Sequence, residues 1–324
     1  MSRIVGLGGG IGASRLWRVL VDSVDSAELT LVVNTGDDLW MHGLRICPDL
    51  DTTLYALSGR QDAERGWGVR DESFRCMGAL RALGHDGWFN LGDLDLATHL
   101  LRTGLLRDGS GLAEVTGRLA AAMGVAARVL PMSEQDVTTV VETDAGTLHY
   151  EEFLVRYGVA PRVQAVRYAG ADAARPAPGV LESLATAEVV VLAPSNPIAS
   201  IAPILEIPGI RKALRDTLAD VVAISPVVSG VPISDPGERR RAASRTTLLA
   251  SRAVPASATG VAGMYRDLCR RFVIDTADAD EAGAVEALGL EPVVVPTLVH
   301  SGAPATALVG AVLSGDGLPV EHLT

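Results

Sequence analysis

The chain has 324 residues, and 48% of them are hydrophobic, so it can bury the core of a large α/β domain and is not a disordered segment. Its 28 Lys and Arg residues against 39 Asp and Glu residues give a net charge of −11. This charge argues against a nonspecific nucleic-acid binder, since no basic stripe is present to displace counterions from phosphates. Lys212 is the only lysine, which excludes a phosphate-loop lysine in the N-terminal half.

The sequence also indicates the compartment. The cysteines Cys47, Cys76 and Cys269 lie far apart without zinc spacing, and prolines and Glu206 interrupt the most apolar stretch, Val189–Ile210. The N-terminus has no signal-peptide pattern. We therefore expect a cytoplasmic protein with neither membrane nor nucleic-acid partners.

Short β-branched runs alternate with helical patterns, which predicts a Rossmann-like, doubly wound and mostly parallel sheet. Ile4–Leu7 and Leu29–Val33 have the pattern of the first two strands, with a helix from about Ala13 between them. Residues from about 54 to 125 are mostly helical in pattern and predict a helix-rich insert within one α/β domain that spans residues 1–324. Alternating residues then predict an antiparallel portion with strands at Ala126–Leu130, Val137–Glu142 and Leu148–Val155.

A second α/β stretch is predicted from about Val163. Its expected strands are Val189–Leu192, Val221–Ile224, Phe272–Asp275 and Pro292–Val295. The segment Pro232–Arg252 carries the charged run Glu238–Arg241. We expect this segment to be a solvated or mobile loop, with a binding patch as the alternative.

A glycine-rich loop follows the first predicted strand, with Gly8, Gly9, Gly10 and Gly12 directly before a helix. Glycines let the backbone approach a ligand, and the helix N-terminus offers free N–H groups to phosphate. The loop alone fits a tight turn equally well. A nicotinamide dinucleotide is disfavoured, because the second strand ends in Asn34-Thr35-Gly36 instead of the acidic residue that holds a ribose.

Four carboxylates follow the second strand within fifteen residues: Asp37, Asp38, Asp49 and Asp51. Like charges that crowd at strand ends repel one another unless a cation shares them, and oxygen ligands suit Mg²⁺. The sequence therefore predicts a magnesium site here. The alternative for Asp49 or Asp51 is a helix N-cap before Thr52–Ser58.

Two further segments carry polar residues. Asp93 is expected to cap a helix whose first turn holds Asp95, with His99 on the same face as a structural partner of Asp95. The segment Ser195-Asn196-Pro197 closes the strand Val189–Leu192, and Asn196 has the pattern of an N-cap before Pro197. Two similar strand ends in one fold predict a divided nucleotide site.

Together these segments resemble the 2-phospho-L-lactate transferase family (CofD, called FbiA in actinobacteria). The segments that carry the resemblance are Gly8–Gly12, Asn34–Asp38, Cys47–Thr52, Leu91–His99, Pro131–Asp136, Pro194–Pro197 and Ser225–Val227. The resemblance implies a step in the biosynthesis of the deazaflavin coenzyme F-420. A phospholactyl or phosphoenolpyruvyl group would pass from a guanosine diphosphate adduct to the ribityl hydroxyl of the deazaflavin Fo, with release of GMP. A homodimer is expected.

The resemblance also assigns roles to residues. The glycine loop, Asn34, Thr35, Ser195 and Asn196 would bind the guanylyl phosphates, and the four aspartates would hold Mg²⁺, with Asp38 and Asp51 catalytic. Fo would contact Asp51 and Asn90, a position where many members carry a basic residue. The aromatic Trp88 and Phe89, with Met77, would supply an apolar surface for Fo. A noncatalytic nucleotide-sugar-binding regulator of the related YvcK-like branch is the alternative, and the four carboxylates favour the enzyme.

Overall fold

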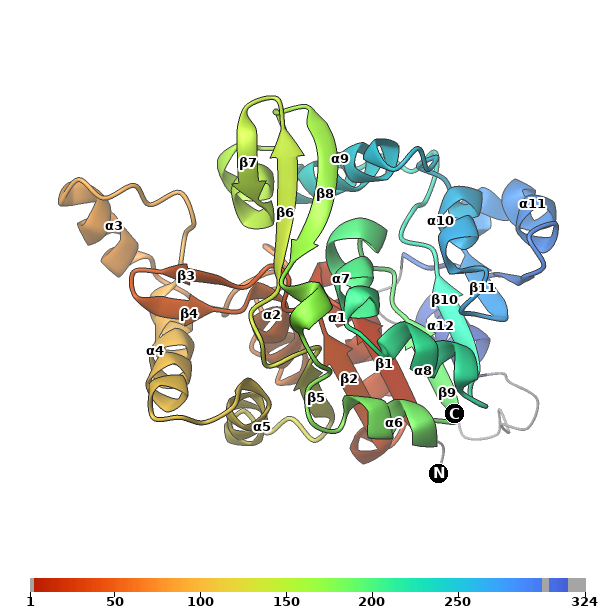
Figure 1. The fold of residues 1–324 in the computed structure, drawn as a ribbon, viewed down its shortest axis with the longest axis horizontal. Helices are drawn as coiled ribbons and strands as arrows, with labels where there is room; N and C mark the ends of the chain where they lie inside the picture. The colour runs from red at the N-terminus through yellow and green to blue at the C-terminus, as the bar shows by residue number, and fades with distance from the viewer. Residues whose placement is uncertain (1–2, 299–302, 314–324) are drawn as a thin grey trace.

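A parallel seven-stranded sheet forms the centre of the computed structural model, which describes residues 3–298 and 303–313 (Figure 1). Its strands are β1 (Ile4–Gly8), β2 (Leu29–Val33), β5 (Arg128–Pro131), β9 (Val189–Leu192), β10 (Asp220–Ile224), β11 (Arg271–Ile274) and β12 (Glu291–Val294). They lie in the order β12-β11-β10-β9-β1-β2-β5. The chain winds outward from β1 to β5 on one side and from β9 to β12 on the other. The predicted doubly wound, Rossmann-like sheet is thereby confirmed, and its direction switches between β1 and β9.

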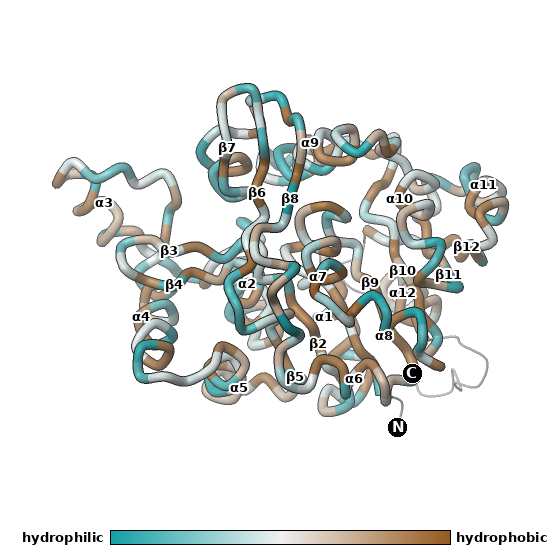
Figure 2. Tube along the Cα trace, viewed as in Figure 1, coloured by the Kyte–Doolittle hydropathy of each residue, from teal (hydrophilic) through white to brown (hydrophobic). Residues whose placement is uncertain are grey.

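Helices cover both faces of this sheet. The α-helices of the described residues are α1 (Gly10–Val21), α2 (Pro48–Leu57), α3 (Arg75–Ala82), α4 (Asp93–Arg107), α5 (Leu112–Ala122), α6 (Val180–Thr186), α7 (Ala202–Glu206), α8 (Ile210–Asp216), α9 (Pro236–Ser251), α10 (Ala258–Tyr265), α11 (Ala282–Glu286) and α12 (Ala303–Leu313), of which all but α3 and α9 pack around this sheet. Alternate strand residues point to opposite faces, so Ile4 packs in the core with α1, α2, α5 and α12, whereas Val5 and Leu7 pack in the core with α6, α8 and α10. Strands buried on both faces are apolar along their length, as Figure 2 shows for the central strands. No helix among the described residues is long and apolar enough to cross a bilayer.

Two small antiparallel sheets complete the fold. One is the hairpin of β3 (Leu39–Met41) and β4 (Leu44–Ile46), and the other has the order β7-β6-β8, from β6 (Thr138–Thr143), β7 (Gly146–His149) and β8 (Val163–Ala169). The prediction of an antiparallel portion is confirmed for β6 and β7. It is wrong for Ala126–Leu130, because β5 pairs in parallel with β2. The stretch beginning near Val163 also starts with a strand of the antiparallel sheet.

The predicted strand Leu148–Val155 ends early. Its last extended residue is His149, and a π-helical turn follows at Glu152–Arg156. Tyr150 and Phe153 are both buried, and a spacing of three residues places them on one side of a turn. Helical spacing therefore replaces strand alternation in this segment.

The loop predicted at Pro232–Arg252 is wrong, because α9 occupies most of it. Asp235 accepts a hydrogen bond from the backbone N–H of Glu238, and Pro236 takes the first helical position. The buried Leu248 and Leu249 then hold the helix on the body of the protein. Figure 1 shows α9 beside β8 above the main sheet. The first helix likewise begins at Gly10, three residues before the predicted start, so the glycine loop itself forms its first turn.

The helices from α3 to α5 do not all pack in the same part of the protein. Figure 1 shows α3 away from the main sheet, whereas α5 packs on β5 and places Val115 and Leu119 in the sheet core. The termini of α3 and α4 are capped reciprocally. Asp93, expected to cap its own helix, accepts hydrogen bonds from the first backbone N–H groups of α3 instead, while the carboxylate of Glu72 accepts from the N–H groups of Leu94 and Asp95. Gly92 at the N-cap leaves room for Glu72, whose carboxylate occupies the space of a Cβ there.

The last described helix is held by a buried arginine. Arg271, on β11, is 2% exposed and pairs with Asp220 on β10. Its guanidinium donates to the carbonyl oxygens of Ala311 and Val312 at the end of α12, the latter over 2.9 Å. Cations stabilise helix C-termini, so this contact fixes α12 against the sheet.

The close contact of Gly6 with Trp17 yields a stability prediction. A Cβ on Gly6 would lie 2.4 Å from the Trp17 ring, which is fully buried between α1 and β1. We expect Gly6→Ala to lower the free energy of unfolding in urea by about 1–3 kcal/mol through overpacking. Adding Trp17→Phe should recover part of that loss. The control is Gly78→Ala in α3, where nothing lies within 4 Å. Equal stability of Gly6→Ala and wild type would contradict this packing.

Candidate active site

A cleft of about 1000 Å³ opens at the carboxyl ends of β1, β2 and β9, where the winding of the sheet changes direction. Ligands of open α/β sheets bind at this kind of switch point. Its wall contains most of the residues singled out from the sequence: Gly9, Gly10, Gly12, Asp37, Asp49, Asp51, Asn90, Ser195 and Asn196. Gly8, Asn34, Thr35 and Asp38 lie behind this wall. The sequence pattern therefore assembles at one place in the fold.

The glycine loop is held against the end of β9. The backbone N–H of Gly9 donates to Ser195 Oγ over 3.2 Å, and this hydroxyl donates to the carbonyl of Gly9 over 2.8 Å. A Cβ on Gly12 would lie 2.2 Å from the carbonyl oxygen of Pro194, and one on Gly8 would lie 2.8 Å from Ala193 Cβ. Close approach of two strand ends thus requires glycine at both positions. It leaves the N-terminus of α1 open to the cleft, where free N–H groups can bind an anion.

Asp49 joins the ends of β1 and β2. Its Oδ2 accepts a hydrogen bond from Asn34 Nδ2 over 2.9 Å, and Asn34 Oδ1 accepts one from the N–H of Gly36 over 2.8 Å. A Cβ on Gly9 would lie only 1.9 Å from Asp49 Oδ2. Asn34 is fully buried, so it orients this carboxylate from behind the cleft wall.

Asp37, Asp49 and Glu151 form what we call the acidic group. All three are buried and line the cleft. Burial raises the pKa of each carboxyl: that of Asp49 to about 6, that of Glu151 to about 8, helped by the charge of Asp49, and that of Asp37 well above its usual range, helped by both neighbours. Asp37 Oδ1 has no hydrogen-bond partner among the described residues. Buried carboxylates without a cation are unfavourable, and the surplus of oxygen ligands fits a divalent ion such as Mg²⁺.

The other two aspartates have arginine partners. Asp38 Oδ2 lies 3.2 Å from Arg45 Nη2, and Arg45 also pairs with Asp136 over 2.7 Å. Burial nevertheless raises the pKa of Asp38 to about 7, because its desolvation outweighs the attraction of Arg45. Asp51 is held by the fully buried Arg102, which donates to both of its carboxylate oxygens. Such two-point contacts fix the plane of a carboxylate.

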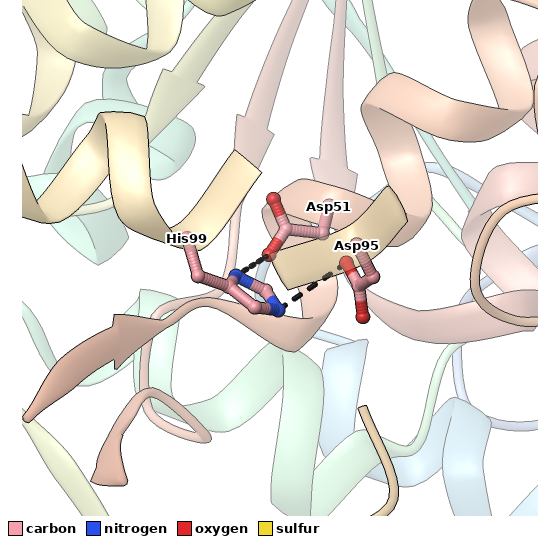
Figure 3. A group of neighbouring side chains, drawn as sticks. All are labelled: Asp51, Asp95 and His99. Carbon is pink, nitrogen blue, oxygen red and sulfur yellow. Dashed lines mark ion pairs between the residues drawn. The ribbon is translucent and has the colours of Figure 1, made fainter. Parts of the chain in front are cut away.

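His99 connects Asp51 with Asp95 (Figure 3). Arg102 Nη1 lies 3.2 Å from His99 Nδ1, and an arginine can only donate, so this nitrogen accepts and Nε2 carries the proton. Nε2 lies 3.2 Å from Asp95 Oδ1 as an ion-pair contact, and the same oxygen accepts a hydrogen bond from the hydroxyl of Tyr55 over 2.6 Å. The predicted pairing of His99 with Asp95 is confirmed.

The three side chains in Figure 3 also meet the geometry of a metal site. Asp51, Asp95 and His99 each offer one ligand atom, and these atoms lie within 4.8 Å of one another. Both oxygens of Asp51 already bind Arg102, however, and Mg²⁺ prefers oxygen to imidazole ligands. Among the described residues, Asp51, Asp95 and His99 are the group whose ligand atoms lie this close together, whereas the acidic group matches Mg²⁺ by its oxygen chemistry without meeting that spacing.

The end of β9 carries the predicted cap. Asn196 Oδ1 accepts hydrogen bonds from the N–H groups of Ile198 and Ala199 over 3.0 and 3.2 Å. Pro197 opens the π-helical turn Pro197–Ile201, so the expected N-cap is confirmed. The Asn196 amide group remains at the cleft wall.

The cleft also has an aromatic part, which we call the aromatic wall. Trp67, Trp88 and Phe89 line it, with Trp88 and Phe89 in edge-to-face contact at 5.5 Å between ring centroids. Met77, expected on this surface, is fully buried in a small core with Ile46 and Leu91. Asn90 Oδ1 accepts a hydrogen bond from Arg81 Nη2 over 2.7 Å. Arg81 thus places a cation beside the position where many family members carry a basic residue.

Two residues of the site escaped sequence reasoning. Glu151 joins aspartates more than 100 positions earlier in the chain, and its segment has a strand pattern, so no local signal marks it. Arg102 had a signal: Asp95, His99 and Arg102 are spaced by four and three residues, which places them on one helical face.

The fold and this cleft define a Rossmann-like α/β protein with a polar site at the switch point of its sheet. The family model for the 2-phospho-L-lactate transferase CofD matches residues 4–283, and the chain belongs to this family of transferases. It is 41% identical to a phosphoenolpyruvate transferase of Streptomyces griseus over 92% of this chain and 93% of that one. It is 38% identical to a 2-phospho-L-lactate transferase of Methanococcoides burtonii over 90% and 92% of the two chains.

A solved structure agrees on the fold. The crystal structure of a UPF0052 family member from Bacillus halodurans matches with a TM-score of 0.60 at 18% identity, over 94% of this chain and 97% of that one. At this identity the match supports the architecture alone.

The raised pKa values predict how stability depends on pH. Asp38 and Glu151, with pKa values of about 7 and 8, retain protons in the folded state that the unfolded chain has already released. Without divalent cations, the free energy of unfolding should therefore fall as the pH rises from about 7 to 9, where histidines are neutral. Urea titrations across this range measure the slope.

Matched variants test the origin of that slope. Glu151→Gln removes one ionisation from the acidic group and should flatten the slope, whereas Glu142→Gln, at a partly exposed side chain of β6, should retain the wild-type slope. A Glu151→Gln slope as steep as that of the wild type would contradict the assignment.

Proposed function

We propose that this chain transfers a three-carbon phosphoacyl unit, phosphoenolpyruvyl or 2-phospho-L-lactyl, from a guanosine diphosphate adduct to the ribityl hydroxyl of Fo, with release of GMP. The observation that carries the proposal is one cleft lined by two unlike sets of residues. The glycine loop and the acidic group are one set, and Trp67, Trp88 and Phe89 are the other. The relatives' names support a donor of this chemistry.

The donor's guanylyl half is assigned to the sheet side of the cleft. The first N–H groups of α1 and the Asn196 amide point to the same space, and the α1 dipole favours the diphosphate. Ser195 holds the loop at Gly9 and so keeps these donors in place before substrate arrives. Phosphoryl transfer depends mainly on such positioning and on charge neutralisation.

Mg²⁺ is assigned to the acidic group, through Asp37 and Asp49 with Glu151 beside them. When bound, the ion would neutralise phosphate charge and stabilise the leaving group. Asn34 holds Asp49 in the required orientation. Asp38 and Asp51 were the remaining candidate ligands, and their arginine partners already supply counter-charge. Asp38 therefore supports the wall from behind, through Arg45.

Fo is assigned to the aromatic wall, since a planar deazaflavin needs an apolar surface with few polar groups. Asp51 lies at the boundary between the two walls, and Arg102 fixes its orientation. Its carboxylate can accept a hydrogen bond from the ribityl hydroxyl and align it for in-line attack on the donor phosphorus. Proton transfer to this carboxylate would accompany formation of the new P–O bond.

Turnover tests the reaction. Purified protein with Fo, Mg²⁺ and each guanylyl donor should release GMP and form a product whose mass equals Fo plus the phosphorylated three-carbon acid minus one water. We expect the enolpyruvyl donor to react faster, because the Streptomyces relative is a phosphoenolpyruvate transferase. EDTA should abolish turnover, and Asp37→Asn should lower it at least 100-fold (on the order of 3 kcal/mol) with little change in melting temperature. Nucleotide binding without turnover of any donor would favour a noncatalytic regulator.

The assignment of the two walls is tested by binding. Trp88→Ala should weaken Fo binding, measured by fluorescence quenching, by about tenfold and leave GDP binding unchanged, because base-sized ring stacking contributes about 1–3 kcal/mol. Asn196→Ala should weaken GDP binding and leave Fo binding unchanged. The reverse pattern would show that the two halves are exchanged.

A further inference from the structure

Helix α9 turns a row of charged side chains toward the cleft. Glu238, Arg241 and Arg245 line the cleft wall, and their spacing of three and four residues places them on one helical face. Arg15, one turn into α1 beyond the glycine loop, lines the same wall. The proposed reaction assigns no role to these side chains.

The charges on this surface do not balance. Glu238 Oε1 lies 2.8 Å from Arg15 Nη2 and 3.2 Å from Arg241 Nη2, so one carboxylate serves two guanidinium groups. Asp235 is 3.7 Å from Arg241 and half-exposed. These arginines hold the pKa of Glu238 below its usual range despite burial. Glu238 is therefore ionised and surrounded by an excess of positive charge.

Arg245 has no such partner. Its guanidinium makes no ion pair or hydrogen bond with the residues that the structure describes, although the side chain is half-buried and borders the cleft. Burial lowers its pKa, and the charge of Arg241 acts in the same direction, against the longer-range attraction of Glu238 and Tyr150. A desolvated cation of this kind is unfavourable until an anion joins it.

We propose that Arg15, Arg241 and Arg245 form an oxyanion-binding site for the donor, which takes either the carboxylate of its three-carbon acid or one of its phosphates. The planar guanidinium fork matches both groups through paired hydrogen bonds. In the empty cleft Glu238 is the counter-anion that an incoming oxyanion replaces. The inference rests on the proposed function only for the identity of the donor.

This site also determines the orientation in which a donor can bind in the cleft. Without a bound cation the acidic group repels an oxyanion from one part of the wall, and the three arginines attract it to another. An extended anionic donor would therefore enter in one orientation. If the carboxylate of the donor binds the arginines, the three-carbon acid lies beside α9. If a phosphate of the donor binds them instead, the diphosphate lies beside α9.

The test measures binding without turnover. Calorimetry compares GDP and phosphoenolpyruvate binding to wild type, Arg245→Gln and Arg252→Gln. Arg252 lies at the far end of α9, contacts Tyr168 and does not line the cleft, so it controls for charge and helix. We expect Arg245→Gln to weaken phosphoenolpyruvate binding by about 10- to 100-fold, the effect of one charge-assisted hydrogen bond, and Arg252→Gln to bind as wild type does.

The two probes separate the sources. Weaker phosphoenolpyruvate binding with unchanged GDP binding identifies the carboxylate, and weaker binding of both identifies a phosphate. Glu238→Gln removes the competing anion and should tighten binding of phosphoenolpyruvate several-fold. This variant tests the proposal through a gain of affinity instead of a loss. Wild-type affinity of Arg245→Gln for both probes overturns the proposal, as does the absence of any binding to wild type. Failure of the proposed function appears differently, as wild-type protein that binds these probes and forms no Fo product.

Discussion

The carboxylate of Asp49 is the contact through which the ends of three strands become one site. It accepts from Asn34 at the end of β2 and occupies the space beside Gly9 at the end of β1, while Ser195 ties the same Gly9 to β9. A Cβ at Gly9 would overlap Asp49, so the glycine loop packs directly against the start of α2. This close packing fixes the position of the loop relative to α2 at the switch point of the sheet. The cleft walls are consequences of that arrangement, because both α1 and α2 start from it.

Electrostatics then divide the cleft wall into regions with separate roles. Arg45 and Arg102 hold Asp38 and Asp51 within the protein, so these side chains are fixed in place. Among the described residues, Asp37 and Glu151 have no arginine partner, and burial with neighbouring carboxylates raises the pKa of both. Perturbed carboxyls in a cleft mark functional sites more often than structural ones. Arg245 is the corresponding cation, which has no ion-pair or hydrogen-bond partner within residues 3–298 and 303–313.

The sequence was most informative where a signal is local. Strand patterns located the sheet within one or two residues, and the strand ends carried Asp37 and Ser195 into one cleft, with Asn34 behind its wall. The prediction failed for segments whose structure depends on contacts with residues far away in the sequence. The charged run of α9 has the composition of a loop, yet Asp235, Pro236 and the buried Leu248 make it a helix. Nothing near Glu151 in the chain reveals that its neighbours are Asp37 and Asp49.

The hydrogen bonds from Arg271 to the end of α12 determine at what stage of synthesis the cleft wall can form. Leu308 of α12 lines the same cleft as Gly9, so the first and last described helices contribute to one wall. A ribosome must therefore release residues through α12 before that wall is complete. Ligand binding cannot guide the folding of the N-terminal strands as they emerge, and the early sheet must find its register from its own hydrophobic pattern.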